Sequence, residues 1–241
     1  MQPTNFDILY EQGPCLAVLK PGGLLTQAPP AIDSLELRVK QFIKLRDDKP
    51  GRVYLGVPHR LDRPVSGVLV LAKHVRAARR LCDQFQDRSV RKTYWAYVAG
   101  TIEADTGTWI DYVRKVPDQP RAEVVAADHP DARQAVLNYL VLRRDERGTW
   151  LEIKLETGRM HQIRLQASSR GFPIFGDAQY GSSERFGPET EDERARWIAL
   201  YARSLDFLHP MTREPVSITA RCRFGGRRSA CRQAEALNVA S

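Results

Sequence analysis

Residues 53–71 read VYLGVPHRLDRPVSGVLVL and place a polar turn between two apolar segments. The first five and the last four of these residues are apolar and adjoin proline or glycine, which is typical of buried strands. The turn between them carries His59, Arg60 and Asp62, and so presents two cations and a carboxylate. Two flanking strands would hold such a turn rigidly, as a catalytic group requires. The alternative is a surface ion pair between Asp62 and a neighbouring arginine.

Outward from this turn, the apolar pattern predicts a mixture of helices and strands. Asp33 and Glu36 resemble a capping box at the start of one helix, and Gly171 is a stop signal for another. The middle helix is predicted to bury Val75 and Cys82 on its apolar stripe. Elements mixed without strict alternation indicate an α+β fold with a mixed, mostly antiparallel sheet. Helices are predicted at residues 33–46, 75–85 and 161–170, and strands at 6–10, 15–19, 53–57, 68–71, 92–98, 108–113, 135–142, 150–155, 200–207 and 216–220.

The composition fits one globular domain with an acidic partner. The chain has 241 residues, of which 42% are hydrophobic, enough for a sizeable core. We expect a catalytic domain at residues 1–225 and a flexible tail at residues 226–241. Lys and Arg number 37 against 29 acids, and this net charge of +8 favours nucleic acid or an anionic surface. Four widely spaced cysteines and the lack of a leader or long apolar stretch predict a cytoplasmic protein without membrane attachment.

A second polar cluster, residues 157–164 (TGRMHQIR), lies at the start of the last predicted helix. His161 and Arg164 would share a face of that helix at this spacing. A helix begins with a partial positive charge, so Arg164 is unfavourable there unless a carboxylate or phosphate answers it. The cluster therefore predicts an anion beside Arg164, and the alternative is an arginine that points to solvent.

Aromatic residues alternate along a third segment, residues 92–98 (KTYWAYV). In a strand, Tyr94 would share a face with Ala96 and Val98. An aromatic side chain near basic residues can stack on an unpaired base. The alternative is that Tyr94 belongs to the core and that its hydroxyl reaches a neighbour.

The three clusters together resemble the RluA-type RNA pseudouridine synthases. The resemblance runs from Ile8 to Ala220, and its motifs occur in the same order. Position 65 departs from the family pattern, with Val for the usual Thr, and Gln166, Ala167 and Tyr201 differ from its common His-containing versions. These departures bear on substrate choice. The matching segments are Lys20-Pro21 with Gly23, residues 59–63 with Ser66-Gly67 and Ala72-Lys73, residues 92–100, residues 157–164 with Gly171, Pro173-Ile174, Gly176-Asp177 and Tyr180-Gly181, and finally His209-Pro210.

The resemblance implies that uridine in RNA is isomerised, on a pseudouridine synthase fold with a positively charged cleft and without cofactor or metal. It implies that Asp62 is the catalytic carboxylate, that Arg164 pairs with it and that Tyr94 stacks on the target base. The expected partner is ribosomal or transfer RNA, bound by a monomer. The other implied roles are insertion of Arg60 where the uridine leaves, a pocket wall at Ile163, substrate contacts of His59, Arg159 and His161, and an RNA-binding surface at Arg76, Arg79 and Arg80.

Two other kinds of function remain open from the residues alone. The first is an RNA-binding protein of the same fold that lacks catalysis. The second is a hydrolytic enzyme, either with Ser66 as nucleophile and His59 or His161 as base, or with Asp62 and histidines as ligands of a metal. The chain has no nucleophile elbow and no metal-ligand spacing, so the isomerase is the preferred hypothesis.

Overall fold

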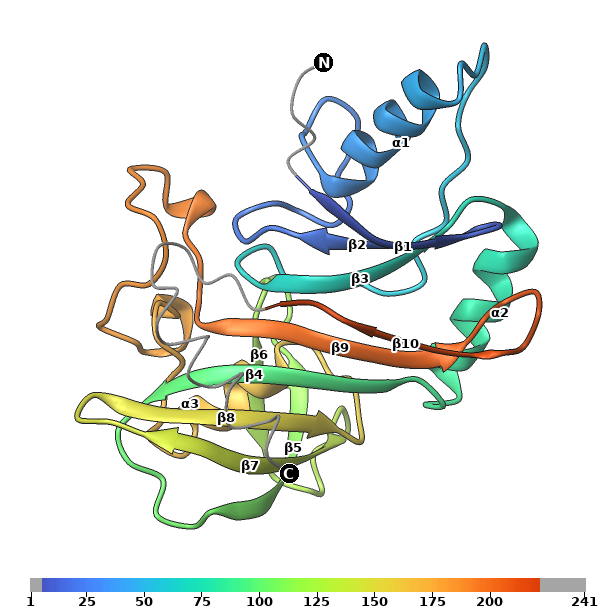
Figure 1. Ribbon diagram of the computed structural model, residues 1–241. Helices are drawn as coiled ribbons and strands as arrows, with labels where there is room; N and C mark the ends of the chain where they lie inside the picture. Colours follow the sequence, from blue (N-terminus) through green and yellow to red (C-terminus); the bar gives the residue numbers. More distant parts are fainter. Residues whose placement is uncertain (1–5, 222–241) are drawn as a thin grey trace. The chain divides into compact units, whose positions relative to one another are not determined.

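A computed structural model describes residues 6–221, and within them it contains ten β-strands and three α-helices (Figure 1). The predicted α+β class is confirmed. The chain divides into two compact units, whose described parts are residues 6–92, 190–195 and 202–221 for the first and residues 93–189 and 196–201 for the second. The predicted tail, residues 226–241, lies outside the described residues. No helix within residues 6–221 is both long and apolar enough to cross a membrane.

The first unit is built on strands whose neighbours follow the order β1-β2-β3-β9, with β10 paired to β9. The pairs β1–β2, β2–β3 and β9–β10 are antiparallel. Every residue of β3 is buried, which explains its continuous apolar sequence. The strand that follows the Asp62 turn therefore lies in the core of this unit. The elements are β1 (Asp7–Gln12), β2 (Cys15–Lys20), α1 (Leu35–Arg46), β3 (Ser66–Ala72), α2 (Val75–Gln86), residues 202–208 of β9 (Leu200–Leu208), and β10 (Pro215–Thr219).

Gly67 permits a close approach between β3 and β9. Its φ is +131°, a conformation that side chains other than glycine rarely adopt. A Cβ atom at this position would lie 2.3 Å from the backbone oxygen of Ala202. Both the backbone conformation and the space thus require glycine directly after the Asp62 turn.

The prediction of a strand at residues 53–57 is wrong. This segment forms only an isolated bridge, in which the N–H and the carbonyl of Gly56 bond to Ala72 at 2.7 and 2.9 Å. A Cβ on Gly56 would lie 2.4 Å from that of Ala78, so the segment passes tightly beneath α2. Only one side of the Asp62 turn is therefore anchored by a strand.

Two local predictions in the helices of this unit are also corrected. The N-cap of α1 is Ser34, whose hydroxyl accepts from the N–H of Leu37, while Asp33 pairs with Arg38. In α2, Val75 and Cys82 are exposed, and the buried positions are Ala77, Ala78, Leu81 and Gln84. Cys82 lies just beyond the edge of the apolar stripe.

The second unit is an antiparallel sheet with one helix. Its strands follow the order β4-β8-β7-β5-β6. Helix α3 packs against β6 and the short 3-10 helix η1, where Leu165 and Tyr180 join a core cluster with Val113, Ala122 and Ala135. Strand β6 was not predicted. The elements are β4 (Arg91–Ala99), β5 (Thr106–Lys115), β6 (Ala122–Val125), β7 (Arg133–Arg144), β8 (Gly148–Leu155), α3 (Gln162–Ser168) and η1 (Ala178–Tyr180).

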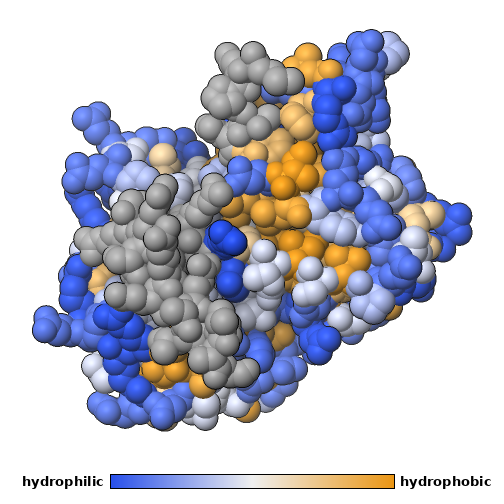
Figure 2. Space-filling model, in the orientation of Figure 1, coloured by the Kyte–Doolittle hydropathy of each residue, from blue (hydrophilic) through white to orange (hydrophobic). Residues whose placement is uncertain are grey.

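The face shown in Figure 2 is mostly hydrophilic, with patches of hydrophobic residues among the hydrophilic ones. Of the basic side chains predicted on α2, Arg76 and Arg79 are exposed. Arg80 is half-buried, and its Nη1 donates to the carbonyl of Pro210 at 2.8 Å. Arg76 and Arg79 are thus the two of these three that face solvent.

Candidate active site

In the first unit, the backbone on the N-terminal side of Asp62 is held by Thr26. The Thr26 hydroxyl accepts from the N–H of Leu61 at 3.2 Å and donates to the carbonyl of the same residue at 2.8 Å. Leu61 is buried, and the N–H of buried Val65 closes the turn on the carbonyl of Asp62 at 3.0 Å. These bonds fix the main chain that carries the Asp62 carboxylate.

On the C-terminal side, the turn is held by Lys20. This side chain is fully buried, and its Nζ donates to the carbonyls of Leu24 at 2.6 Å, Pro21 at 2.9 Å and Arg63 at 3.1 Å. Burial lowers the pKa of Lys20 to about 7, while the negative charge of Asp62 acts in the opposite direction. Lys20 thus couples to Asp62 both through the backbone of the turn and through its charge.

His59 accepts a hydrogen bond through a ring nitrogen, so the prediction that it adds a second cation to the turn is wrong. Its Nε2 accepts from the N–H of Val70 at 3.0 Å, and its ring stacks on Phe85 at a centroid distance of 4.3 Å. Burial, and then the positive charge of Lys92, lower the pKa of His59 to about 3. A ring nitrogen used in this way does not serve as a base for Ser66. The predicted contact of His59 with substrate stays a prediction.

Arg60 is exposed, next to the anchored part of the turn. Its insertion where the uridine leaves stays a prediction.

In the second unit, Arg164 is buried against a carboxylate, so it does not point to solvent. Its Nε and Nη2 bond to the two carboxylate oxygens of Asp177 at 2.6 and 2.8 Å. The side chains are 4% and 1% exposed, respectively. The anion predicted beside Arg164 is therefore present as Asp177. The predicted pair of Arg164 with Asp62 joins residues of different units and stays a prediction.

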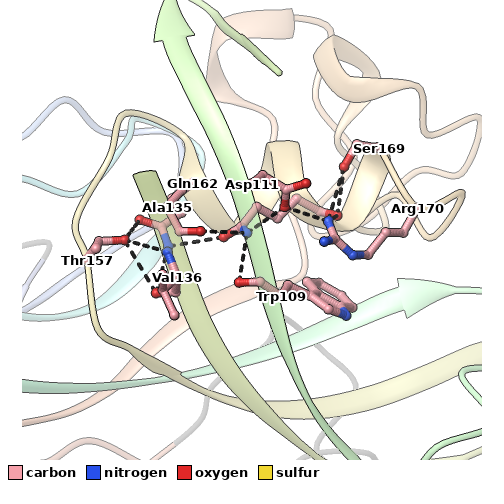
Figure 3. A network of polar contacts seen from close by, with 9 residues as sticks. Trp109, Asp111, Ala135, Val136, Thr157, Gln162, Ser169 and Arg170 are labelled. Carbon is pink, nitrogen blue, oxygen red and sulfur yellow. Dashed lines mark hydrogen bonds and ion pairs between the residues drawn. The ribbon is translucent and has the colours of Figure 1, made fainter. Parts of the chain in front are cut away.

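Helix α3 is fixed to the sheet by a chain of buried amide side chains (Figure 3). The Thr157 hydroxyl donates to Gln162 Oε1 at 2.8 Å, and Gln162 Nε2 donates to Gln166 Oε1 at 3.0 Å. Gln166 Nε2 then donates to Asp111 Oδ2 at 2.7 Å, and Arg170 Nη1 reaches the same oxygen at 2.7 Å. Sequence reasoning missed this network, although two glutamines at i and i+4 were a signal that they face one another.

His161 and Arg164 meet at one aromatic ring, as their predicted common face requires. His161 Nδ1 lies 2.9 Å from the Tyr180 hydroxyl, and the Arg164 guanidinium lies over the Tyr180 ring at 4.9 Å. His161 has a left-handed φ of 51° and is the N-cap residue of α3, but its side chain makes no capping hydrogen bond. Ile163 is buried on the same helix.

Arg159 is tied to the loop before α3. Its N–H donates to Gln162 Oε1 at 2.9 Å, and its Nε donates to the carbonyl of Gln134 at 2.9 Å. The guanidinium therefore anchors the loop on β7, a role that the sequence did not predict. Its contact with substrate stays a prediction.

Tyr94 is half-buried on β4, opposite Ile153 of β8. Strand alternation places it on the face of Ala96 and Val98, which are both fully buried. The ring thus continues an apolar surface towards the start of the strand. Stacking on a base stays a prediction.

Residues 6–221 contain no group of three or more His, Cys, Asp or Glu side chains close enough together to hold a metal ion.

Comparison with known proteins gives matches over most of the chain. A family model described as RNA pseudouridylate synthase matches residues 15–169. The Xanthomonas campestris protein named ribosomal large subunit pseudouridine synthase D is 33% identical over 226 residues, which cover 91% of this chain and 66% of that protein. The Pasteurella multocida protein named tRNA pseudouridine synthase C is 34% identical over 229 residues, which cover 90% of this chain and 91% of that protein.

A solved structure shares the fold. Human RNA Pseudouridylate Synthase Domain Containing 4 superposes with a TM-score of 0.73 at 22% identity, covering 95% of this chain and 92% of the human chain. At this identity the likeness concerns the fold.

Proposed function

The chain belongs to the RNA pseudouridylate synthase family, whose reaction isomerises uridine in RNA, and we propose that Asp62 is the carboxylate that performs this reaction. The observation that supports the role best is the setting of the Asp62 turn, which Thr26 and Lys20 hold on its two sides. A catalytic group must be kept within a fraction of an ångström of its productive position. A surface ion pair needs no such support.

The chemistry requires an ionised carboxylate beside the ribose. The reaction breaks the glycosidic bond, turns the uracil and joins it again through carbon 5. A carboxylate can assist by attack on the anomeric carbon or by removal of a ribose proton. Both routes need Asp62 in its charged form, and an arginine partner stabilises that form where water is excluded.

Arg164 is the partner that we assign to Asp62. Its Nε and Nη2 are bonded to Asp177, and Nη2 is also bonded to Gln179 at 2.8 Å, so the plane of the guanidinium is fixed within its own unit. A planar donor group held in this way would orient the carboxylate as well as stabilise its charge.

The substrate that we propose is a uridine of ribosomal or transfer RNA, turned out of its stack. Stacking on Tyr94 and insertion of Arg60 would offset the unstacking cost of a few kcal/mol. Ile163 would line the base pocket, and exposed Arg76 and Arg79 would contact phosphates. Relatives named for a ribosomal and for a transfer RNA support both classes.

The test is tritium release from RNA labelled at carbon 5 of uridine, in excess chelator and without added cofactor. We expect Asp62→Asn to abolish release while RNA binding survives, because affinity rests on Lys and Arg contacts to phosphate. Asp83→Asn, which neutralises an exposed acid on α2 of the same unit, is the control and should keep its activity. Robust turnover by Asp62→Asn, or a metal requirement, would remove this assignment. Ribosomal and transfer RNA would be assayed separately to identify the substrate class.

A further inference from the structure

In the second unit, Arg164 and Asp177 form an ion pair whose two side chains are almost completely buried. Nε–Oδ2 and Nη2–Oδ1 distances of 2.6 and 2.8 Å make it a bidentate pair, and Asp177 is 1% exposed. The main chain of Asp177 is also fixed, because its N–H donates to Ile174 and its carbonyl accepts from Tyr180 and Ser182, each at 3.0 Å. Asp177 therefore offers Arg164 a carboxylate that has little freedom to move.

Stability alone is a weak reason for such a pair. Removing both charges from water costs several kcal/mol per ion, and apolar residues of similar volume often serve as well. What a bidentate pair provides in addition is geometry, since two parallel bonds fix the plane and the rotation of the guanidinium. The arrangement thus fits a role in orientation.

The residues after Asp177 complete the support of Arg164. Gln179 accepts from Nη2 at 2.8 Å and donates onward to the carbonyl of Pro120 at 3.0 Å. The Tyr180 ring lies under the guanidinium, and its hydroxyl accepts from the N–H of Ala122 at 2.9 Å. Contacts from one short segment, residues 177–180, thus hold Arg164 and tie it to the start of β6.

We propose that Asp177 is a positioning residue of the reaction, and that Gln179 assists it. Asp177 fixes the guanidinium of Arg164 before RNA binds, so that Arg164 in turn holds the catalytic carboxylate in its charged form. Asp177 itself touches neither substrate nor reacting atoms. The inference rests on the proposed function, because it requires Arg164 to act on Asp62.

The decisive variant is Asp177→Asn in the full chain. The amide keeps the volume but replaces one acceptor oxygen with an NH2 group, which opposes an N–H of Arg164. We expect the single-turnover rate to fall on the order of a hundredfold, as for a misplacement of about 1 Å. The RNA dissociation constant should change by less than about twofold, because no contact to phosphate is lost.

The pH profile separates positioning from a structural role. If Arg164 loses its orientation, the charged form of the catalytic carboxylate is less favoured, and the acidic limb of the rate profile should move up by about one pH unit. Glu123→Gln is the matched control, because it breaks an ion pair with Arg114 in the same unit without touching Arg164. It should leave the acidic limb in place.

Two further outcomes keep the inference separate from the proposed function. If Asp62→Asn and Arg164→Lys are inactive while Asp177→Asn keeps a normal rate and profile, the positioning role is overturned and the proposed function stands. If circular dichroism shows that Asp177→Asn does not fold, Gln179→Ala decides the question. It removes one bond to Arg164, and we expect a loss on the order of tenfold with the same shift of the acidic limb. An unchanged rate and limb in Gln179→Ala would overturn the inference.

Discussion

Replacement of Arg164 by lysine keeps the positive charge and removes the planar donor group. Nε and Nη2 of Arg164 donate to Asp177, and Nη2 also donates to Gln179. The single ammonium of lysine cannot reproduce the two parallel bonds to Asp177. We therefore count at least two charge-assisted hydrogen bonds as lost, each contributing about 1.5–3 kcal/mol.

These magnitudes predict a collapse of the rate with little change in affinity. Two lost bonds amount to about 3–6 kcal/mol. A hundredfold loss of rate corresponds to about 2.7 kcal/mol, so the lost bonds exceed what is needed to misplace the catalytic carboxylate. The net charge of Arg164→Lys is that of the natural chain, and the salt dependence of RNA binding should therefore be nearly unchanged.

The assay pairs single-turnover tritium release with filter binding between about 50 and 200 mM salt. Arg114→Lys is the control, because Arg114 also pairs with a carboxylate in the second unit, that of Glu123. That pair is partly exposed and should contribute little, so its rate should stay within about twofold of normal. A near-normal rate for Arg164→Lys, with weaker binding and a shallower salt dependence, would show that Arg164 belongs to the RNA-binding surface instead.

Two further predictions concern the support of the Asp62 turn. Because the pKa of His59 is lowered to about 3 in the folded chain, only the unfolded chain protonates this side chain just below pH 6.5. The free energy of unfolding should therefore fall by up to about 1.4 kcal/mol per pH unit as the pH decreases towards 4.5. Urea unfolding at several pH values should show this pH dependence. His59→Gln keeps an acceptor for the N–H of Val70 but cannot titrate, so it should make the free energy of unfolding less dependent on pH. An unchanged pH dependence in this variant would mean that His59 is not its source. Gly67→Ala should lower stability by more than about 2 kcal/mol, because its Cβ would lie 2.3 Å from the Ala202 oxygen, whereas Gly51→Ala meets nothing within 4 Å. Thermal unfolding compares the two, and equal midpoints would contradict the close approach.

The sequence predicted most elements because their apolar patterns reflect burial on one or both faces. Strand β3 is apolar throughout because every residue is buried. Residues 53–57 are similarly apolar, but only Gly56 pairs, and a short apolar run cannot distinguish a strand from a buried connection. Strand β6 has only four residues and pairs with the preceding strand β5, and so short a segment carries too little apolar pattern to be recognised as a strand.

In the candidate site, the sequence predicted the chemical type of a side chain's interaction partner better than it predicted which residue supplies it. The position of Arg164 at the start of a helix indicated an anion beside it. That anion is Asp177, which lies 13 residues later in the sequence, beyond a loop. The state of His59 depends on Phe85, which comes from α2, and on the N–H of Val70. Neither contact leaves a local signal in the sequence. A charge assigned from residue type alone was therefore wrong where tertiary packing removes water.

The buried cations Arg164 and Lys20 are stabilised in different ways. The difference affects how the activity of Asp62→Asn must be interpreted. Arg164 is held by an opposite charge, whereas Lys20 is held by three carbonyl oxygens, which replace water only in part and leave its pKa near 7. The negative charge of Asp62 raises the pKa of Lys20, so removal of that charge would lower the pKa further. Lys20 would then more readily lose the proton and the positive charge with which it binds the carbonyl of Arg63. Asp62→Asn thus perturbs the support of the turn as well as the chemistry. A loss of rate in this variant measures catalysis by the carboxylate only if its unfolding midpoint and RNA affinity match those of the natural chain.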